Sequence, residues 1–156
     1  MAQFAENTSV SVERSRAEIE GLIVRYGATS TAFMNAPGRA MIVFEVNNRR
    51  VAFELPLPDR DEKQFQRDGR GSMRSPAKRL EAWEQAYRTR WRALALVIKA
   101  KLEAVQSGIT TFEDEFLAHI VMPDGQTVAK HVRPQIKMAY DEGRMVPLLP
   151  APSRPQ

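Results

Sequence analysis

Arginines alternate with aromatic residues in one short stretch of this chain. The run Tyr87-Arg88-Thr89-Arg90-Trp91-Arg92 combines the two side-chain types that bind single-stranded nucleic acid, since guanidinium groups hold phosphates and aromatic rings stack on bases. The aromatic residues of the run also share one helix stripe with apolar neighbours, which favours a core position for their rings. The arginines therefore remain as the candidate phosphate contacts.

Further arginines lie in regions that we expect to be exposed. Residues 60–101 carry twelve basic and five acidic side chains, a net charge of +7, and residues 102–122 carry −4, within an overall charge of +4. Concentrated positive charge binds polyanions in a salt-sensitive, sequence-independent way, although an ordinary solvated surface is the alternative interpretation. A charged loop folded over a hairpin would complete a basic groove. The candidate nucleic-acid-binding residues are Arg49, Arg50, Arg70, Arg74, Arg88, Arg90 and Arg92.

The sequence lacks the usual catalytic signatures. It has no glycine-rich phosphate loop and no cysteine, and its two histidines, His119 and His131, are not spaced as paired metal ligands on a helix. The carboxylates Glu45 and Glu54, and those at 113–115, are not expected to converge. We therefore expect no catalytic residue, no metal site and no cofactor, and keep a metal-dependent nuclease as the minor alternative.

Length and composition limit the class of protein. The chain has 156 residues and is 43% hydrophobic, which suits a single domain over residues 1–150. No apolar run approaches the roughly 18 residues of a membrane span. The polar N-terminal residues lack the apolar core of a secretory signal, so we expect a cytoplasmic protein. Prolines concentrated after Met145 predict an extended tail that is disordered at 151–156.

A helix followed by a three-stranded meander is the expected first half of the fold. Apolar residues three and four apart predict a helix over 12–26 that is capped by Ser9 or Ser11. Alternating apolar residues then predict strands at 29–35, 40–46 and 49–55, joined by two-residue turns at 37–38 and 47–48. These turns place one apolar set on a single sheet face, which supports the register. That face comprises Phe33, Ile42, Phe44, Val51 and Phe53.

A long helix is the main element expected in the second half. Residues 59–74 are charged and aperiodic, and they predict a mobile loop. Ser75 and Pro76 then open a helix over 76–106. Its apolar stripe is continuous from Leu80 onwards, and we expect the whole stripe to lie against the apolar sheet face.

Two shorter helices are expected near the C-terminus. One is predicted at 112–121, where Glu113 has the spacing of a capping box. The other is predicted from Thr127 to Glu142, interrupted or kinked at Pro134. The expected fold class is therefore α+β, with an N-terminal helix, an antiparallel meander and one long amphipathic helix packed on one sheet face.

Several segments also resemble a known group of proteins. They are Arg25-Tyr26-Gly27-Ala28, Leu55-Pro56-Leu57-Pro58, Arg90-Trp91-Arg92-Ala93-Leu94 with Ile98-Lys99-Ala100-Lys101-Leu102-Glu103, Thr111-Phe112-Glu113-Asp114-Glu115-Phe116-Leu117-Ala118, and Pro123-Asp124-Gly125-Gln126-Thr127. Over roughly residues 10–150 the chain resembles short, mostly uncharacterised, non-structural proteins of tailed bacteriophages and prophages. The resemblance implies the cytoplasm of an infected bacterium as the setting. It implies no catalytic residue.

Two functions fit these observations. The first is a non-enzymatic phage accessory protein that binds single- or double-stranded nucleic acid through its arginines during phage DNA replication or recombination. The alternative is a protein-binding inhibitor or regulator of a host enzyme or anti-phage defence complex, whose acidic surface would pair with the same arginines. The outer sheet face, with Met41 and Val43, is either a dimer contact or is covered by a C-terminal helix.

Overall fold

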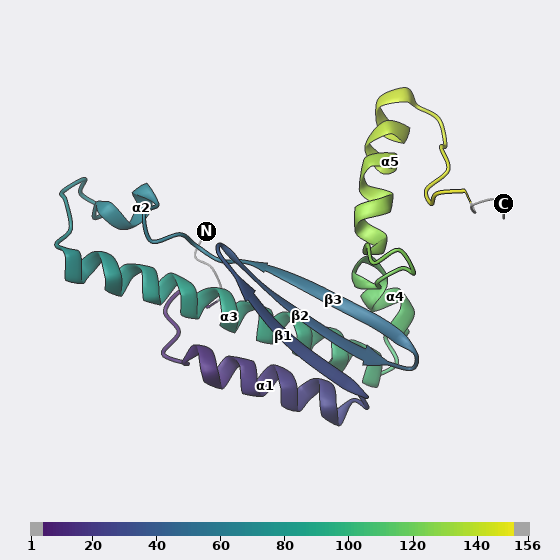
Figure 1. Ribbon diagram of the computed structural model, residues 1–156, viewed down its shortest axis with the longest axis horizontal. Helices are drawn as coiled ribbons and strands as arrows, with labels where there is room; N and C mark the ends of the chain where they lie inside the picture. The colour runs from purple at the N-terminus through teal and green to yellow at the C-terminus, as the bar shows by residue number, and fades with distance from the viewer. Residues whose placement is uncertain (1–4, 152–156) are drawn as a thin grey trace.

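The computed structural model describes residues 5–151, which form one three-stranded antiparallel sheet and several helices (Figure 1). The order of elements confirms the α+β class. The predicted disordered tail at 151–156 lies outside the described residues, except for Ala151. In chain order the elements are α1 Val12–Arg25, β1 Ser30–Ala36, β2 Arg39–Val46, β3 Arg49–Pro56, α2 Lys63–Gln66, α3 Pro76–Gln106, α4 Phe112–Phe116, the 3₁₀ helix η1 Leu117–His119, and α5 Val128–Glu142.

The predicted register of the meander is confirmed. Phe33 pairs with Ile42 across β1 and β2, and Ile42 pairs with Phe53 across β2 and β3. Asn47 and Asn48 both have positive φ angles, of 51° and 58°, which is the conformation that a two-residue hairpin of this kind requires. The two turns and the alternation of apolar residues therefore specify one sheet geometry.

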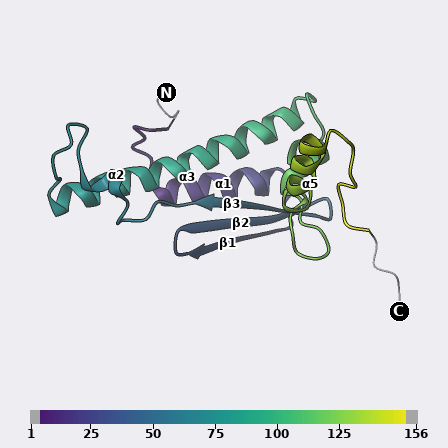
Figure 2. The same ribbon diagram turned by 90° about the horizontal axis from the view of Figure 1, so that it is seen from above.

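Both long helices, α1 and α3, lie on the same side of the sheet (Figure 2). Ser11 begins α1 by accepting a hydrogen bond from the backbone N–H of Arg14 at 3.1 Å. The apolar stripe of α1 contributes the fully buried Ile19 and Ile23 to a core shared with α3 and the inner sheet face. Burial of these side chains supplies the main favourable term in the stability of the domain.

The helix α3 is only partly covered, which corrects the expectation that its whole stripe contacts the sheet. Between Trp91 and Leu102 the stripe is buried, and Trp91 is only 1% exposed. Towards its N-terminus the helix extends past the sheet (Figure 1), and there Leu80 is 41% exposed. A 31-residue helix spans about 46 Å, whereas an eight-residue strand spans about 26 Å.

The segment 59–74, predicted as a mobile loop, contains one short helix within an otherwise irregular chain. It contains the short helix α2, which packs against α3, and Phe65 of this helix is only 4% exposed. Arg67 and Met73 form an isolated antiparallel bridge that closes the rest of the loop. One buried aromatic residue in an otherwise charged run therefore anchors the segment.

The C-terminal helices also differ from the expectation. The helix predicted at 112–121 ends at Phe116 and continues only as the single 3₁₀ turn η1, because Ile120 pairs with Val51 at the edge of the sheet. The cap of α4 uses Thr111 and Asp114 rather than Glu113: the Thr111 hydroxyl donates to the Asp114 carboxylate at 2.9 Å and accepts from its backbone N–H at 3.2 Å.

The last helix, α5, is not interrupted at Pro134. It runs as one helix from Val128 to Glu142 and gives up the backbone hydrogen bond that proline cannot donate. It ends at Gly143, whose φ of 66° fits the left-handed cap. In Figures 1 and 2 this helix stands at the end of the molecule opposite α2, and none of its residues is buried.

Candidate nucleic-acid interface

Basic side chains gather at one end of the molecule, which we call the basic end. It comprises residues 57–90, which are the β3–α3 connection with α2 and the first half of α3 (Figure 1). Its acidic side chains are Asp59, Asp61, Glu62, Asp68, Glu81 and Glu84. Its basic side chains are Arg60, Lys63, Arg67, Arg70, Arg74, Lys78, Arg79, Arg88 and Arg90.

Several carboxylates of the basic end accept hydrogen bonds from the backbone. Asp68 Oδ1 accepts from the N–H groups of Arg70 and Ser72, at 2.9 Å each. Glu62 Oε1 accepts from the N–H of Asp59 at 2.8 Å, and the carboxylate of Asp59 accepts from the N–H of Asp61 at 2.9 Å. These carboxylates stabilise the turns of the loop. They are therefore not used as partners of the basic side chains.

No ion pair among the described residues involves the basic end. Six Lys/Arg–carboxylate pairs and one histidine–carboxylate contact, all within 4.0 Å, lie in other parts of the fold. They are Arg39–Glu54, Arg50–Glu45, Arg92–Glu18, Lys101–Glu115, His131–Asp124, Lys137–Asp141 and Arg144–Glu142. Nine basic against six acidic side chains leave residues 57–90 with a net charge of +3, and none of these cations has a carboxylate within 4.0 Å among the described residues.

Two arginines of the basic end stabilise the loop that carries Arg70. Arg67 Nη1 donates to the carbonyl O of Gly71 at 2.7 Å, and Arg74 Nη1 donates to that of Gln64 at 3.3 Å. The loop closes between them and presents Arg70, which is exposed, within the turn that Asp68 stabilises. The local hydrogen bonds thus position a cation at the outer part of the loop.

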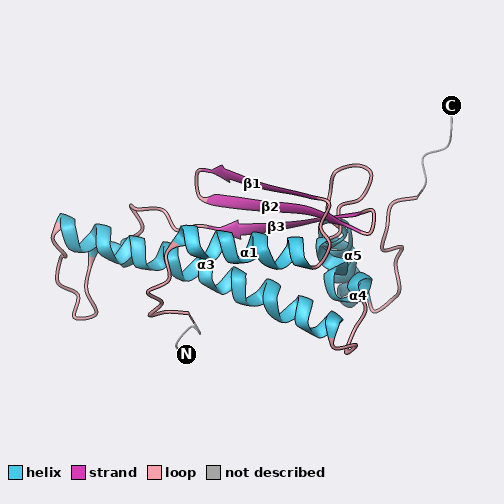
Figure 3. Cartoon of the chain, turned by 90° about the horizontal axis from the view of Figure 1, so that it is seen from below, coloured by secondary structure: helices cyan, strands magenta, loops and turns pink. Residues whose placement is uncertain are grey.

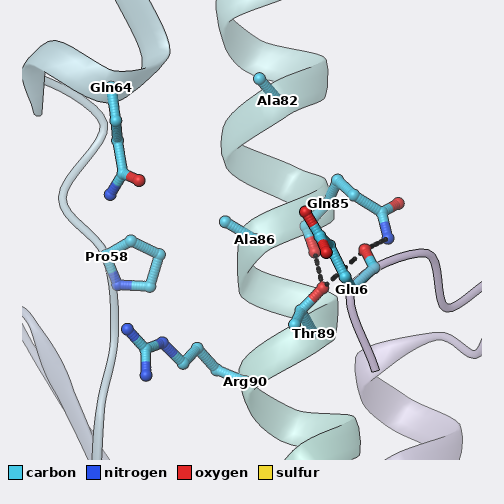
Figure 4. Close-up of a pocket in the computed structure, with 8 residues that line it drawn as sticks. All are labelled: Glu6, Pro58, Gln64, Ala82, Gln85, Ala86, Thr89 and Arg90. Atoms are coloured by element: carbon cyan, nitrogen blue, oxygen red, sulfur yellow. Dashed lines mark hydrogen bonds between the residues drawn. The ribbon is translucent and has the colours of Figure 1, made fainter. Parts of the chain in front are cut away.

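A cleft lies between α3, the start of the β3–α3 connection and the N-terminal segment (Figure 4). Its volume is about 360 Å³, and the guanidinium of Arg90 points across it towards Pro58. Thr89 Oγ1 donates to the carbonyl O of Glu6 at 3.2 Å, and Gln85 Nε2 donates to the same atom at 3.0 Å. Two side chains of α3 therefore hold the N-terminal segment beside Arg90.

The aromatic residues of α3 divide between the core and this surface. Trp91 is buried, so its ring is not available for base stacking. Trp83 and Tyr87 are half-buried, with ring centroids 5.1 Å apart. Trp83 Nε1 donates to the carbonyl O of Pro58 at 2.8 Å, and the Arg60 guanidinium lies 4.3 Å from the centroid of the Trp83 ring. Arginine and aromatic groups thus share one surface at the basic end.

The structure brings together only part of the predicted set of arginines. Arg70, Arg74, Arg88 and Arg90 lie at the basic end. The turn that carries Arg49 and Arg50 lies at the opposite end of the sheet, whereas the loop starts beside the other turn, where the Leu57 N–H donates to the Gly38 carbonyl O at 2.9 Å (Figure 1). The predicted groove between this loop and the arginines at 49–50 is therefore not formed.

Two further predicted arginines have partners of their own. Arg92 forms an ion pair with Glu18 of α1, and Arg50 lies 3.9 Å from Glu45 across the hairpin. Sequence reasoning also left out Lys63 and Lys78, which are exposed at the basic end. Their presence within the +7 segment was the available signal.

A second cavity, which we call the α5 cavity, lies at the other end of the molecule. It has a volume of about 420 Å³ between α3, η1 and α5. Its lining is mainly apolar, with Leu117, Val132 and Ile136 on facing elements. Lys101 Nζ donates to the carbonyl O and to Oε1 of Glu115, at 3.0 Å each, so this cation is neutralised by its neighbour.

His119 lines the α5 cavity and is half-buried. Its ring stacks on Phe53, with the two centroids 4.0 Å apart. Burial lowers the pKa of His119 below the ordinary 6.5, and the nearby Lys101 ammonium lowers it further, while a backbone hydrogen bond with Ala52 acts in the opposite direction. The imidazole is therefore neutral at neutral pH.

Residues 5–151 contain neither a cluster of metal ligands nor a helix that could span a membrane. Within this range no three His, Asp or Glu side chains are grouped so that they could hold a metal ion, and no helix is long and apolar enough to cross a membrane. The chain matches none of the protein-family models, curated proteins or solved structures with which it was compared.

Proposed function

We propose that this protein binds nucleic acid through the basic end. The observation that carries the proposal is that residues 57–90 combine nine basic side chains with no close ion pair among residues 5–151, while the pairs that do form there lie elsewhere. Cations without a carboxylate partner are free to neutralise phosphates, and the release of counterions then favours binding.

The expected binding mode is contact with the phosphate backbone. Arg70 of the loop and Lys78 of α3 are exposed, and Arg90 points into the α3 cleft (Figure 4). Trp83 and Tyr87 add half-buried rings at the same end of the molecule, with the Arg60 guanidinium over the Trp83 ring, and this favours single strands because unpaired bases can stack on aromatic rings. Recognition of this kind depends on charge and stacking and is largely independent of sequence.

The resemblance to non-structural phage proteins supplies a setting for this activity. A protein that binds single strands without sequence preference would serve phage DNA replication or recombination in the host cytoplasm. We assign no bond-making step to the chain. Its proposed role is to bind single strands.

Fluorescence anisotropy of labelled oligonucleotides tests the proposal. Single- and double-stranded DNA and RNA of equal length would be titrated at low and at near-physiological salt. We expect the tightest binding to single strands and a steep loss of affinity with salt, with a slope set by the number of phosphates contacted. Absence of binding to all forms at low salt would overturn the proposal.

A protein partner is the second candidate, and the exposed face of α5 favours it. Ile136 is 45% exposed and Tyr140 is 86% exposed, and Ile136 continues the apolar lining of the α5 cavity. A host protein could place an apolar helix along this face. Val132→Asp with Ile136→Asp should then abolish capture of a bacterial protein, while oligonucleotide binding at the basic end stays unchanged.

A further inference from the structure

The two edges of the sheet differ in how they are covered. At the β3 edge, Ile120 pairs with Val51, and the Val121 N–H donates to the carbonyl O of Arg50 at 2.8 Å. At the β1 edge, no described element lies alongside the strand in Figures 1, 2 and 3. Every second residue of β1 therefore turns its backbone N–H and C=O groups towards an open edge.

The β1 strand also lacks the features that usually protect an open edge. Proteins discourage pairing at such edges with charged side chains, prolines or very short strands. Strand β1 has seven residues, and its sequence, STAFMNA, contains neither a charge nor a proline. An uncharged edge of this length is a template for a further strand.

The inner face of β1 is incompletely covered by the chain's own helices. Phe33 of β1 is only half-buried. Ile42, which pairs with it on β2, and Phe53, which pairs with Ile42 on β3, are both buried. The ring of Phe33 meets Trp91 at 6.5 Å between centroids, and the Arg16 guanidinium lies 5.1 Å from its centroid. Beyond this point the apolar layer ends at the open edge, where a further apolar side chain would extend it.

We propose that β1 pairs antiparallel with β1 of a second copy of this chain, giving a continuous six-stranded sheet across a two-fold axis. Such pairing must keep inner faces on the same side, so inward residues lie opposite inward residues. Full overlap of all seven residues then sets Phe33 opposite Phe33 of the second copy. The two rings form a cross-strand aromatic pair that extends the inner apolar layer.

The residues of β1 favour its own copy as the occupant. In this register the small Ala32 lies opposite the large Met34 of the second copy on the outer face, and Thr31 lies opposite Asn35, so that a hydroxyl faces an amide. Since the strand carries no charge, no like charges are brought together across it, although the chain as a whole carries +4. A C2 dimer needs such a self-complementary surface.

Light scattering coupled to size-exclusion chromatography tests the proposal on the full chain. We expect a mass of twice 17.7 kDa at the higher concentrations. Two double variants at exposed positions then test the register. Ala32→Lys with Met34→Lys sets lysine opposite lysine twice and should give a monomer. Ala32→Lys with Met34→Glu sets lysine opposite glutamate twice and should keep the dimer.

Each outcome decides the proposal. Circular dichroism first establishes that both variants keep the wild-type fold, as expected since Met34 is 49% exposed and Ala32 is also exposed. A monomeric wild type at every concentration overturns the proposal. A dimer that persists in both folded variants also overturns it, since the interface then lies elsewhere. A monomeric mass for both variants overturns it as well, since the register is then different.

Discussion

The two ends of α3 differ in the partners of their charged side chains. Near its C-terminus, Lys101 is paired with Glu115, their charged atoms being 3.0 Å apart. At the basic end, carboxylates such as that of Asp68 accept from backbone N–H groups, and no close ion pair forms within the part of the chain that the structure describes. The number of charges in a segment therefore does not determine its function, because the partner of each carboxylate decides which cations stay available.

The same helix also shows how coverage separates core from surface. Trp83 and Trp91 belong to one apolar stripe, but only Trp91 lies where the sheet and α1 cover it. Trp83 belongs to the N-terminal part of α3 and is half-buried, and the helix extends past the sheet at that end (Figure 1). A continuous stripe in the sequence can therefore serve as core over one half and as a half-exposed surface over the other.

The largest expected effect tests this division of the stripe. Trp91→Ala removes a side chain that is 1% exposed and should lower the free energy of unfolding by about 3–5 kcal/mol. Trp83→Ala, at the half-buried position, should cost clearly less. Urea denaturation of both variants measures the difference. Equal losses, or an unchanged melting temperature for Trp91→Ala, would show that the two halves of α3 are not covered differently.

The next effect concerns the order of the loop at the basic end. Phe65→Ala removes the one buried apolar side chain of this loop and should speed trypsin cleavage after Arg67 or Arg70, with little change in global unfolding. Met73→Ala is the matched control, because Met73 is 54% exposed in the same loop. Equal cleavage rates for wild type and Phe65→Ala would refute the anchoring role of Phe65.

A smaller effect is expected at the opposite end, from His119. Because its pKa is lowered on folding, the unfolded chain binds the proton more readily than the folded chain. The contribution of His119 to the free energy of unfolding is therefore fully present above pH 6.5. It is lost as the pH falls below 6.5 towards the lower pKa of the folded state. His119→Gln should reduce this loss. Stability curves of both proteins between pH 8 and pH 5 that run parallel would contradict the assignment.

The sheet could be predicted from the sequence because its information is local. Asn47-Asn48 and the alternation of apolar residues are sufficient to set Ile42 opposite Phe53. The length of the sheet relative to α3 is also implicit in the residue counts, but the position of the helix along the sheet is not. That position depends on packing between distant segments, and it decides that Leu80 is exposed.

The candidate site was harder to predict because availability depends on contacts distant in sequence. Arg92 looks equivalent to Arg90 in the sequence, yet Glu18 of α1 pairs with Arg92, whereas Arg90 points into the α3 cleft. Local signals were present for two other features. The pairing of Arg50 with Glu45 follows from the predicted register, and the isolated Phe65 marks the anchor of the loop.

Comparison of two triple variants with the same net charge tests the central claim most directly. Arg70→Ala, Lys78→Ala and Arg90→Ala remove three cations from the basic end. Arg49→Ala, Lys99→Ala and Lys130→Ala remove three exposed cations from other parts of the fold, so that both variants carry +1. The affinity of each variant for the same labelled single strand is then measured at low salt. Because the net charge is the same, a difference in affinity reports the position of the removed cations.

We expect the basic-end variant to lose roughly tenfold or more in affinity and its salt slope to fall by about 1 for each lost phosphate contact. The second variant should bind nearly as the wild type does. Equal losses of affinity in the two variants would contradict the account, because net charge rather than the basic end would then determine binding.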